Sequence, residues 1–333
     1  MVRSTGKVHI YHLTVVLFCS YLSIAVAIGL LFCGRQVTTV FSATTVGVPV
    51  TVTVNFINVG QGDSIFIETS GKDVLIDGGI SDAGSTVVNY LSSLNITCID
   101  LMIATHAHED HIGGLLAVLE SNVTVAAVLV NGQTSASSTY TNFMRLAQNH
   151  TVIVAQRGQT YELTSMANLT VFNPTQPLEF AGLNDNSIVV RFQSGNVSFL
   201  FAGDAEEQAE QSMLDARLEL RSTVLKVGHH GSRTATTELF LDAVSPSYAI
   251  ISAGKNNSYG HPHSETLQKL LVKGATVYGT YSSGTVVMST DGASVAIQDN
   301  PQPVPEFQSN PILILLIIVT LFTVINHKRK CTS

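Results

Sequence analysis

The sequence predicts an α+β fold in which two β-sheets lie sandwiched between two helical layers, with an apolar segment at each terminus. Short β-branched runs fill residues 51–298 and alternate with segments of helical apolar spacing. Strands and helices mixed in this way favour a pair of sheets covered by helices. With 333 residues, of which 45% are apolar, the chain can bury a core of that size.

The first part of this region predicts three strands in close succession. They are VTVNFINV (52–59), IFIET (65–69) and DVLIDGG (73–79). Their short connections predict antiparallel pairing. A helix is expected at 85–94, and the buried strand LMIAT (101–105) leads through a turn into a helix at 112–120.

The second part repeats the alternation of strands and helices. The predicted elements are a hairpin at 187–193 and 197–204, helices at 205–219, 237–245 and 263–274, and strands at 223–231, 248–254, 275–281 and 285–290. Polar residues that follow these strands therefore collect at sheet edges.

The N-terminal segment, residues 1–34, predicts a membrane signal. Residues 13–33 carry no charge and follow a basic start, which suits a signal anchor of about 20 apolar residues. A cleaved signal peptide is the alternative, because Ala25-Val26-Ala27 matches an A-x-A cleavage pattern. A lipoprotein site at Cys33 is a third alternative. Residues 35–50 are expected to be a linker to the domain at 51–300.

The C-terminal segment predicts a second membrane signal. Residues 301–310 form a proline-rich spacer, and residues 311–326 are expected to form a transmembrane helix. The basic tail at 327–333 predicts a cytoplasmic end. With both ends on that side, the domain would lie at the cell membrane and face the exterior or a lumen.

Potential glycosylation sites agree with this location. Six N-x-S/T sequons occur in the domain, at Asn95, Asn122, Asn149, Asn168, Asn196 and Asn256. Cys98 is the only cysteine there, so no disulfide can form within the domain.

The charge of the domain limits its partners. Residues 35–310 carry 12 Lys and Arg against 24 Asp and Glu. A negative body of this kind repels polyanions at long range. The composition therefore counts against a general nucleic-acid-binding surface.

The stretch THAHEDHIGG (105–114) is the strongest chemical motif of the chain. It places His106, His108, Asp110 and His111 directly after an apolar strand. In extended backbone His106 and His108 share a face, while Asp110 and His111 lie in the expected turn. Imidazoles with a carboxylate suit zinc, and also manganese or iron. The motif therefore predicts a metal site.

Further candidate ligands follow other apolar strands. Asp77 ends LIDGG, Asp204 ends FLFAGD, His229 and His230 end LKVGHH, and His261 and His263 lie in YGHPH. A single aspartate after a strand is commonly a turn residue or helix cap. Several such sites together predict that residues distant in the chain converge on a pair of metal ions.

These motifs resemble the metallo-β-lactamase superfamily. The set LIDGG, THAHEDHIGG, FAGD and LKVGHHGS carries the likeness over about residues 51–298. VGQGDS (59–64), HHGS and YGHP resemble the branch that contains the C-terminal domain of the competence protein ComEC, involved in DNA uptake. The resemblance implies a four-layer αββα sandwich with its active site at one edge of the sheets.

The resemblance also implies metal ligands. His106 and His108 would bind a first ion, Asp110 and His111 a second, and Asp204 would bridge both. His230 is favoured over His229 as a further ligand of the second ion, although the reverse assignment stays open. Two zinc ions are expected, with manganese as the alternative.

Other matching residues would act around the metals. Asp77 is expected to orient a ligating histidine rather than to bind metal. Asp110 would orient or deprotonate the attacking water. His229 and His261 would hold the developing charge and serve the leaving group. An ordinary loop histidine is an equal interpretation of His261.

The sequence departs from the family pattern at two places. Many members have another histidine before the bridging aspartate, where this chain has LNDNS (183–187). Asn184 or Asp185 could complete the shell of the first ion there. Asn58 replaces the aspartate usual before VGQGDS, whereas Asp63 remains and is expected to hold the turn near the site.

The leading functional hypothesis is a membrane-anchored, extracellular, metal-dependent phosphodiesterase of nuclease type. Its substrate would be a phosphate ester, single-stranded DNA or a surface polymer. One alternative is hydrolysis of a lactone, lactam or thioester on the same fold. Another is a surface binding module without catalysis. The sequence identifies no protein partner.

Overall fold

The computed structural model describes residues 51–299 and 301–305. Over these residues no helix combines the length and apolarity that crossing a bilayer requires. The predicted N-terminal signal (1–34), linker (35–50), transmembrane helix (311–326) and basic tail (327–333) lie outside the described residues. They remain predictions.

The described residues form two β-sheets. The eight-stranded sheet has the order β15-β14-β1-β2-β3-β4-β5-β6, and the seven-stranded sheet has the order β13-β12-β11-β10-β9-β8-β7. The strands of the first sheet are β1 (Val52–Phe56), β2 (Ile65–Glu68), β3 (Val74–Ile76), β4 (Cys98–Ala104), β5 (Thr124–Val130), β6 (Thr151–Val154), β14 (Val286–Thr290) and β15 (Val295–Ile297). Those of the second are β7 (Thr160–Thr164), β8 (Ala167–Asn173), β9 (Val189–Ser194), β10 (Val197–Phe201), β11 (Val224–Lys226), β12 (Tyr248–Ile251) and β13 (Thr276–Gly279).

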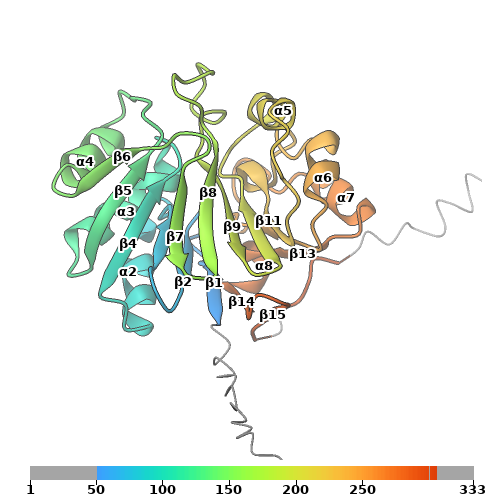
Figure 1. Cartoon of the computed structure of the whole chain (residues 1–333), viewed down its shortest axis with the longest axis horizontal. Helices are drawn as coiled ribbons and strands as arrows, with labels where there is room; N and C mark the ends of the chain where they lie inside the picture. Colours follow the sequence, from blue (N-terminus) through green and yellow to red (C-terminus); the bar gives the residue numbers. More distant parts are fainter. Residues whose placement is uncertain (1–50, 300, 306–333) are drawn as a thin grey trace, which may run out of the picture. The chain divides into compact units, whose positions relative to one another are not determined.

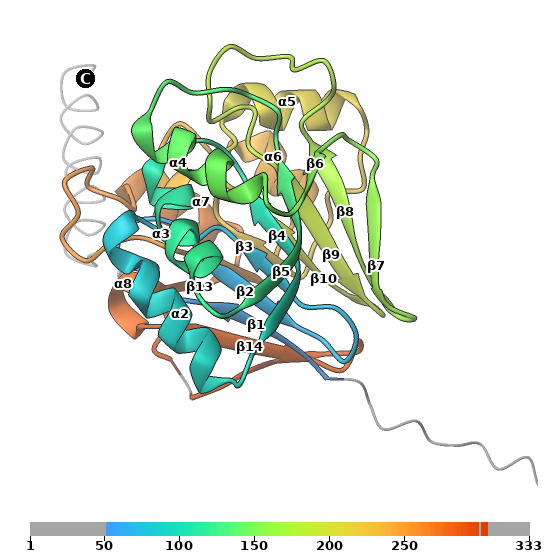
Figure 2. The ribbon, with the colours of Figure 1, turned by 90° about the vertical axis from the view of Figure 1, so that its left-hand side faces the viewer.

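Helices cover the outer faces of both sheets (Figures 1 and 2). On the first sheet they are η1 (Ser81–Ala83), α2 (Gly84–Ser93), α3 (Glu109–Glu120) and α4 (Ser138–Ala147). On the second they are α5 (Glu207–Asp215), α6 (Glu238–Val244) and α7 (Ser264–Val272). The predicted two-sheet sandwich with helical outer layers is confirmed.

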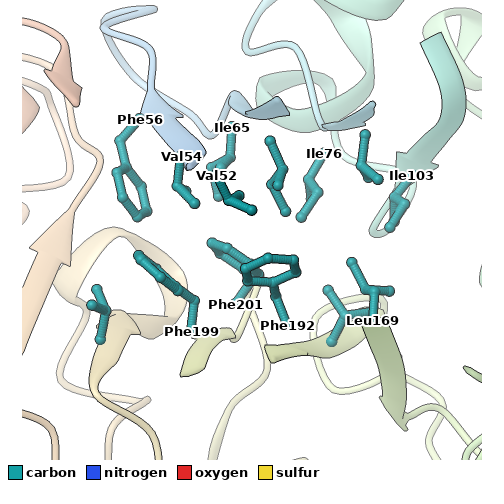
Figure 3. Close-up of a cluster of buried hydrophobic side chains, with 14 of the residues drawn as sticks. Val52, Val54, Phe56, Ile65, Ile76, Ile103, Leu169, Phe192, Phe199 and Phe201 are labelled. Atoms are coloured by element: carbon teal, nitrogen blue, oxygen red, sulfur yellow. The ribbon is translucent and has the colours of Figure 1, made fainter. Parts of the chain in front are cut away.

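The main core lies between the two sheets. Figure 3 shows side chains such as Ile65 and Ile103 from the first sheet facing Phe192, Phe199 and Leu169 from the second. Each of these five side chains is almost completely buried. Burying apolar surface on both inner faces is the largest favourable contribution to folding, so this layer holds the two sheets as one frame.

Strand direction determines where the polar loops gather. β1, β2 and β3 pair antiparallel, as predicted. β3 to β6 run parallel, and so do β10 to β13. Parallel strands end at the same edge of a sheet, where ligands of such sheets commonly bind. The loops after β3, β4, β10, β11 and β12 therefore reach the same edge of the sandwich.

Candidate metal centre

Three buried side chains from two distant segments of the chain form the first candidate ligand group. His106 follows β4, His111 lies in α3, and Asp204 follows β10. One ligand atom from each lies within 4.8 Å of the others. The His111 Nε2 atom is 3.2 Å from Asp204 Oδ1, and the His106 Nε2 atom is 3.8 Å from Asp204 Oδ2. Residues 98 positions apart are thus brought to one point.

A second candidate group shares His111 and adds Asp110 and His230. The His230 Nε2 atom lies 3.2 Å from Asp110 Oδ2 and 3.5 Å from Asp204 Oδ1. Asp204 thus lies beside both groups, which is the position expected of a bridging carboxylate.

His108 lies at the N-terminal boundary of α3, next to the first group. Its Nδ1 atom is 2.9 Å from His106 Nε2, and its ring is half-buried. It belongs to none of the four His/Asp groups that the described residues form with close ligand atoms. The structure therefore places a His108 nitrogen next to the His106 ligand atom, at the edge of the first group.

The helix after the motif begins earlier than predicted. Asp110 and His111 lie in the first turn of α3, which starts at Glu109, and not in a preceding turn. The Ile112 amide donates to the His108 carbonyl at 3.1 Å. Acidic residues at a helix N-terminus favour this start because they face the positive end of the helix dipole. The apolar pattern begins only at Ile112, so apolar spacing alone marked the helix too late.

Asp77 holds His111 through the ring nitrogen that faces away from the ligand groups. Its Oδ2 atom accepts a hydrogen bond from His111 Nδ1 at 2.7 Å, while Thr105 donates to both carboxylate oxygens, at 2.8 and 2.7 Å. Asp77 is fully buried, and burial raises its pKa although His111 opposes the shift. Holding Nδ1 in this way leaves His111 Nε2 facing the candidate metal position.

Asp63 and Lys226 support His230. Asp63 Oδ1 lies 3.2 Å from His230 Nδ1, and the same nitrogen donates to the Ser252 carbonyl at 3.0 Å. Asp63 Oδ2 accepts from Lys226 Nζ at 2.7 Å. The expectation that Asp63 holds a turn is only part of its role here. Its amide does bond to the Asp110 carbonyl, at 3.2 Å, but its carboxylate faces the centre.

His229 and His261 line the pocket above the ligand groups. This pocket has a volume of about 330 Å³, and its lining also includes His108, Asp110, Asp204 and His230. His229 Nδ1 donates to Glu206 at 2.8 Å, and its Nε2 atom is 3.6 Å from Asp204. The two rings of His229 and His261 are 5.4 Å apart. Burial and the neighbouring His229 lower the pKa of His261 to about 4.

In the LNDNS loop, Asn184 and Asp185 do not join the ligand groups, whereas Ser187 contacts one of their histidines. Asp185 accepts hydrogen bonds from the Glu206 and Ala209 amides at 3.2 and 3.1 Å, so its carboxylate caps the start of α5. Asn184 donates to Glu206 at 3.3 Å. Neither belongs to the candidate ligand groups. Ser187 takes the place next to His106, with its Oγ atom 3.3 Å from Nδ1.

Four residues that were not predicted support the site, and one of them, Lys226, has a recognisable signal in the sequence. Thr105, Ser187, Glu206 and Lys226 contact predicted site residues. Lys226 interrupts the apolar strand VLKV, and a cation at such a position needs a buried partner. That requirement could have pointed to Asp63. The hydroxyls of Thr105 and Ser187 have no comparable mark in the sequence.

Unpartnered buried atoms test whether the group fits a cation. His111 Nε2, His230 Nε2 and Asp204 Oδ1 are buried and form no hydrogen bond within the described residues. Leaving a buried polar atom unpaired costs about 1–3 kcal/mol. Divalent cations bound by the two ligand groups would satisfy these atoms, because each of the three residues belongs to at least one of the groups, and the donor set suits zinc or manganese. The residues present therefore fit a divalent metal.

The sequence comparison gives the family. Residues 57–255 match the Metallo-beta-lactamase superfamily, and the chain belongs to it. The predicted resemblance is confirmed, and the αββα sandwich with a His/Asp cluster at one sheet edge agrees with it.

Curated relatives refine this placement. ComE operon protein 3 of Bacillus subtilis is 32% identical over 253 residues, covering 70% of this chain and 32% of that protein. Recombination protein 2 of Haemophilus influenzae is 30% identical over 238 residues, covering 70% of this chain and 28% of that protein. The chain thus spans about a third of the length of these relatives. Exodeoxyribonuclease WalJ of Streptococcus pneumoniae is 25% identical over 178 residues, covering 52% of this chain and 64% of that protein.

Proposed function

We propose that residues 51–300 form a metal-dependent phosphodiesterase of nuclease type. The observation that carries this proposal is the convergence of His111, Asp204 and His230, whose buried ligand atoms lack partners, next to a pocket that Asp204 and His230 line. The similarity to a protein named exodeoxyribonuclease supports a phosphodiester substrate over an acyl one.

In this proposal His106, His111, Asp110, Asp204 and His230 hold one or two divalent ions, with His108 completing the set. A divalent ion bound there would lower the pKa of water toward about 7 and so supply a nucleophile at neutral pH. Lewis-acid chemistry of this kind requires a fixed ligand frame, which the strand-end loops provide.

Pocket residues also orient the substrate and move protons. Asp110, a half-buried residue of the pocket lining, orients the attacking water or accepts its proton while it holds the metal. Glu206 holds His229 through Nδ1, and as an imidazolium paired with that carboxylate His229 can donate from Nε2 to a phosphate oxygen. His261 lines the same pocket next to His229 and has a lowered pKa, so near pH 7 it is neutral and positions the leaving group through a hydrogen bond.

Single-stranded DNA or a surface polymer is the proposed substrate class, because the domain offers few cations to a duplex. A duplex-binding surface is usually strongly basic. Residues 35–310 are instead strongly acidic. Bound divalent ions would supply the positive charge that the protein surface lacks.

We also propose that the domain is anchored at the membrane and faces the exterior or a lumen. The apolar segments at 13–33 and 311–325 motivate this placement. Of the six sequon asparagines, all but the half-buried Asn168 are exposed, as glycan attachment requires. Two measurements test this placement. One is whether protease added to sealed membrane vesicles can digest the domain, and the other is whether a glycosidase changes its electrophoretic mobility. Digestion of the domain only from the cytoplasmic side would contradict it.

The function itself is tested with the full chain in detergent, on a panel of an aryl phosphodiester, a lactone and a lactam. The proposal predicts metal-dependent cleavage of the phosphodiester and a loss of about 100-fold or more in Asp204→Asn. His150→Ala is the matched control, because His150 bonds the Val125 carbonyl away from the pocket. Preferential cleavage of the lactone or lactam would support acyl chemistry instead.

A further inference from the structure

A second hollow adjoins the metal pocket and shares a wall with it. Its volume is about 470 Å³, and it lies between residues 58–60, the start of α2 and α8 (Thr280–Ser283). Ile80 lines both hollows, while the consecutive residues Gly60 and Gln61 line one each. A ligand that extends from the metal pocket past Ile80 therefore enters the second hollow.

Hydrogen bonds fix the passage between the two hollows. The Gln61 side chain accepts from the Gly254 amide at 3.2 Å, and Asn58 accepts from the Gly60 amide at 3.2 Å. Gly60 has φ of +73°, and a Cβ there would meet no atom within 4 Å. The backbone at residue 60 is thus held in a left-handed turn with open space above it.

The second hollow offers one cation and one aromatic ring. Lys255 is exposed and forms no ion pair within the described residues. It follows Gly254, which holds Gln61, so its backbone is tied to the passage. Asp82 and Tyr281 also line the hollow. The Lys255 ammonium can pair with the single negative charge of a phosphodiester, and a tyrosine ring can stack on a planar group.

Resting on the proposed phosphodiesterase function, we propose that the second hollow is a subsite for the next unit of a chain-like substrate. When the scissile phosphate lies in the metal pocket, the neighbouring phosphodiester lies at Lys255 and its adjoining group contacts Ile80 and Tyr281. The enzyme then selects linear phosphodiesters of two or more units over small esters. Lys255 and the walls of the hollow determine this specificity.

The test compares octathymidylate with bis-p-nitrophenyl phosphate, using the full chain supplied with manganese or zinc. Lys255→Ala removes the cation, and Thr86→Trp fills the hollow from the exposed side of α2. Both variants should lower the ratio of kcat/KM for the octamer to kcat/KM for the small ester by about 10-fold. Lys72→Ala and Ser92→Trp, exposed positions outside the hollow, are the matched controls and should leave the ratio unchanged.

The outcomes separate the two proposals. An unchanged ratio in Lys255→Ala and Thr86→Trp overturns the subsite, and so does equal loss on both substrates. Cleavage of the small ester without cleavage of the octamer by the native chain also overturns it. Failure of the native chain to cleave either substrate overturns the phosphodiesterase function itself. Circular dichroism of each variant shows that a changed ratio does not come from unfolding.

Discussion

Lys226 Nζ lies 2.7 Å from Asp63 Oδ2, and both side chains are almost completely buried directly behind His230. The ammonium also donates to the Val227 carbonyl at 3.0 Å. The other oxygen of Asp63 faces His230. The ion pair therefore connects strand β11 to a histidine of the candidate metal centre and fixes the direction of its ring.

Lys226→Met should destabilise the fold. The variant keeps a long side chain but removes the cation at Oδ2 of the buried Asp63, which leaves only His230 beside that charge and costs up to about 3–5 kcal/mol. Urea unfolding of the metal-free chain measures the loss in free energy of unfolding. Lys273→Met is the control, because Lys273 pairs with Asp242 near the surface and should change stability by less than about 1 kcal/mol. Equal effects of the two substitutions would show that the buried pair is not needed.

Asp77→Asn should weaken metal binding while the ligands themselves stay in place. The neutral side-chain amide of the variant lacks the negative charge of the carboxylate that accepts the hydrogen bond from His111 Nδ1. Losing such a supporting carboxylate typically costs about 10- to 100-fold in metal affinity. Competition with a chromophoric chelator measures the affinity. Asp242→Asn, an exposed carboxylate on α6, is the matched control. If Asp77→Asn kept the native metal affinity, the Asp77 carboxylate would not be needed to hold His111 for metal binding.

Metal binding should release protons and strengthen as the pH rises. In the metal-free protein burial opposes protonation of His230, but Asp204 and Asp63 outweigh it and raise its pKa to about 10. Burial likewise opposes protonation of His111, whose pKa Asp204 and Asp77 raise well above its usual value.

Both rings therefore carry a proton at neutral pH that a cation must displace, and lowering the pH makes this displacement harder. Calorimetry in buffers of different ionisation enthalpy measures the released protons. Binding that releases none, with affinity independent of pH, would contradict this prediction.

His229 and His230 should differ in what their loss does. His230 Nε2 faces Asp110 and Asp204 from a buried position, whereas His229 is partly exposed and held by Glu206. His230→Ala should therefore lose bound metal, while His229→Ala should keep the metal and lose turnover. Metal content measured beside kcat distinguishes the two. The opposite pattern would assign His229 as the ligand.

The sequence predicted the parts of the fold that have strong periodic signals. The three antiparallel strands from Val52 onward, the hairpin before Asp204 and the helix around Val87 all occur as expected. No elements were predicted for residues 121–186, yet these residues form β5, α4, β6, β7 and β8. Strands β6 and β7 alternate weakly and remain partly exposed, so their apolar pattern is faint.

Most candidate site residues could also be predicted from the sequence, because they follow apolar strands. It could not show which atoms meet, since packing of two sheets decides whether Asp185 caps a helix or approaches His106. In the structure Asp185 caps the start of helix α5, and Ser187 instead lies next to His106. The role of Lys226 likewise depends on a contact with Asp63, 163 positions earlier in the chain.

The most direct test of the metal centre is elemental analysis of the purified full chain and of Asp204→Asn. Because Asp204 lies beside both ligand groups, we expect about one to two divalent ions per native chain and almost none in the variant. His150→Ala should retain the native content. A native chain that binds less than about one ion in ten molecules after incubation with zinc or manganese would contradict the account, and so would full metal content in Asp204→Asn.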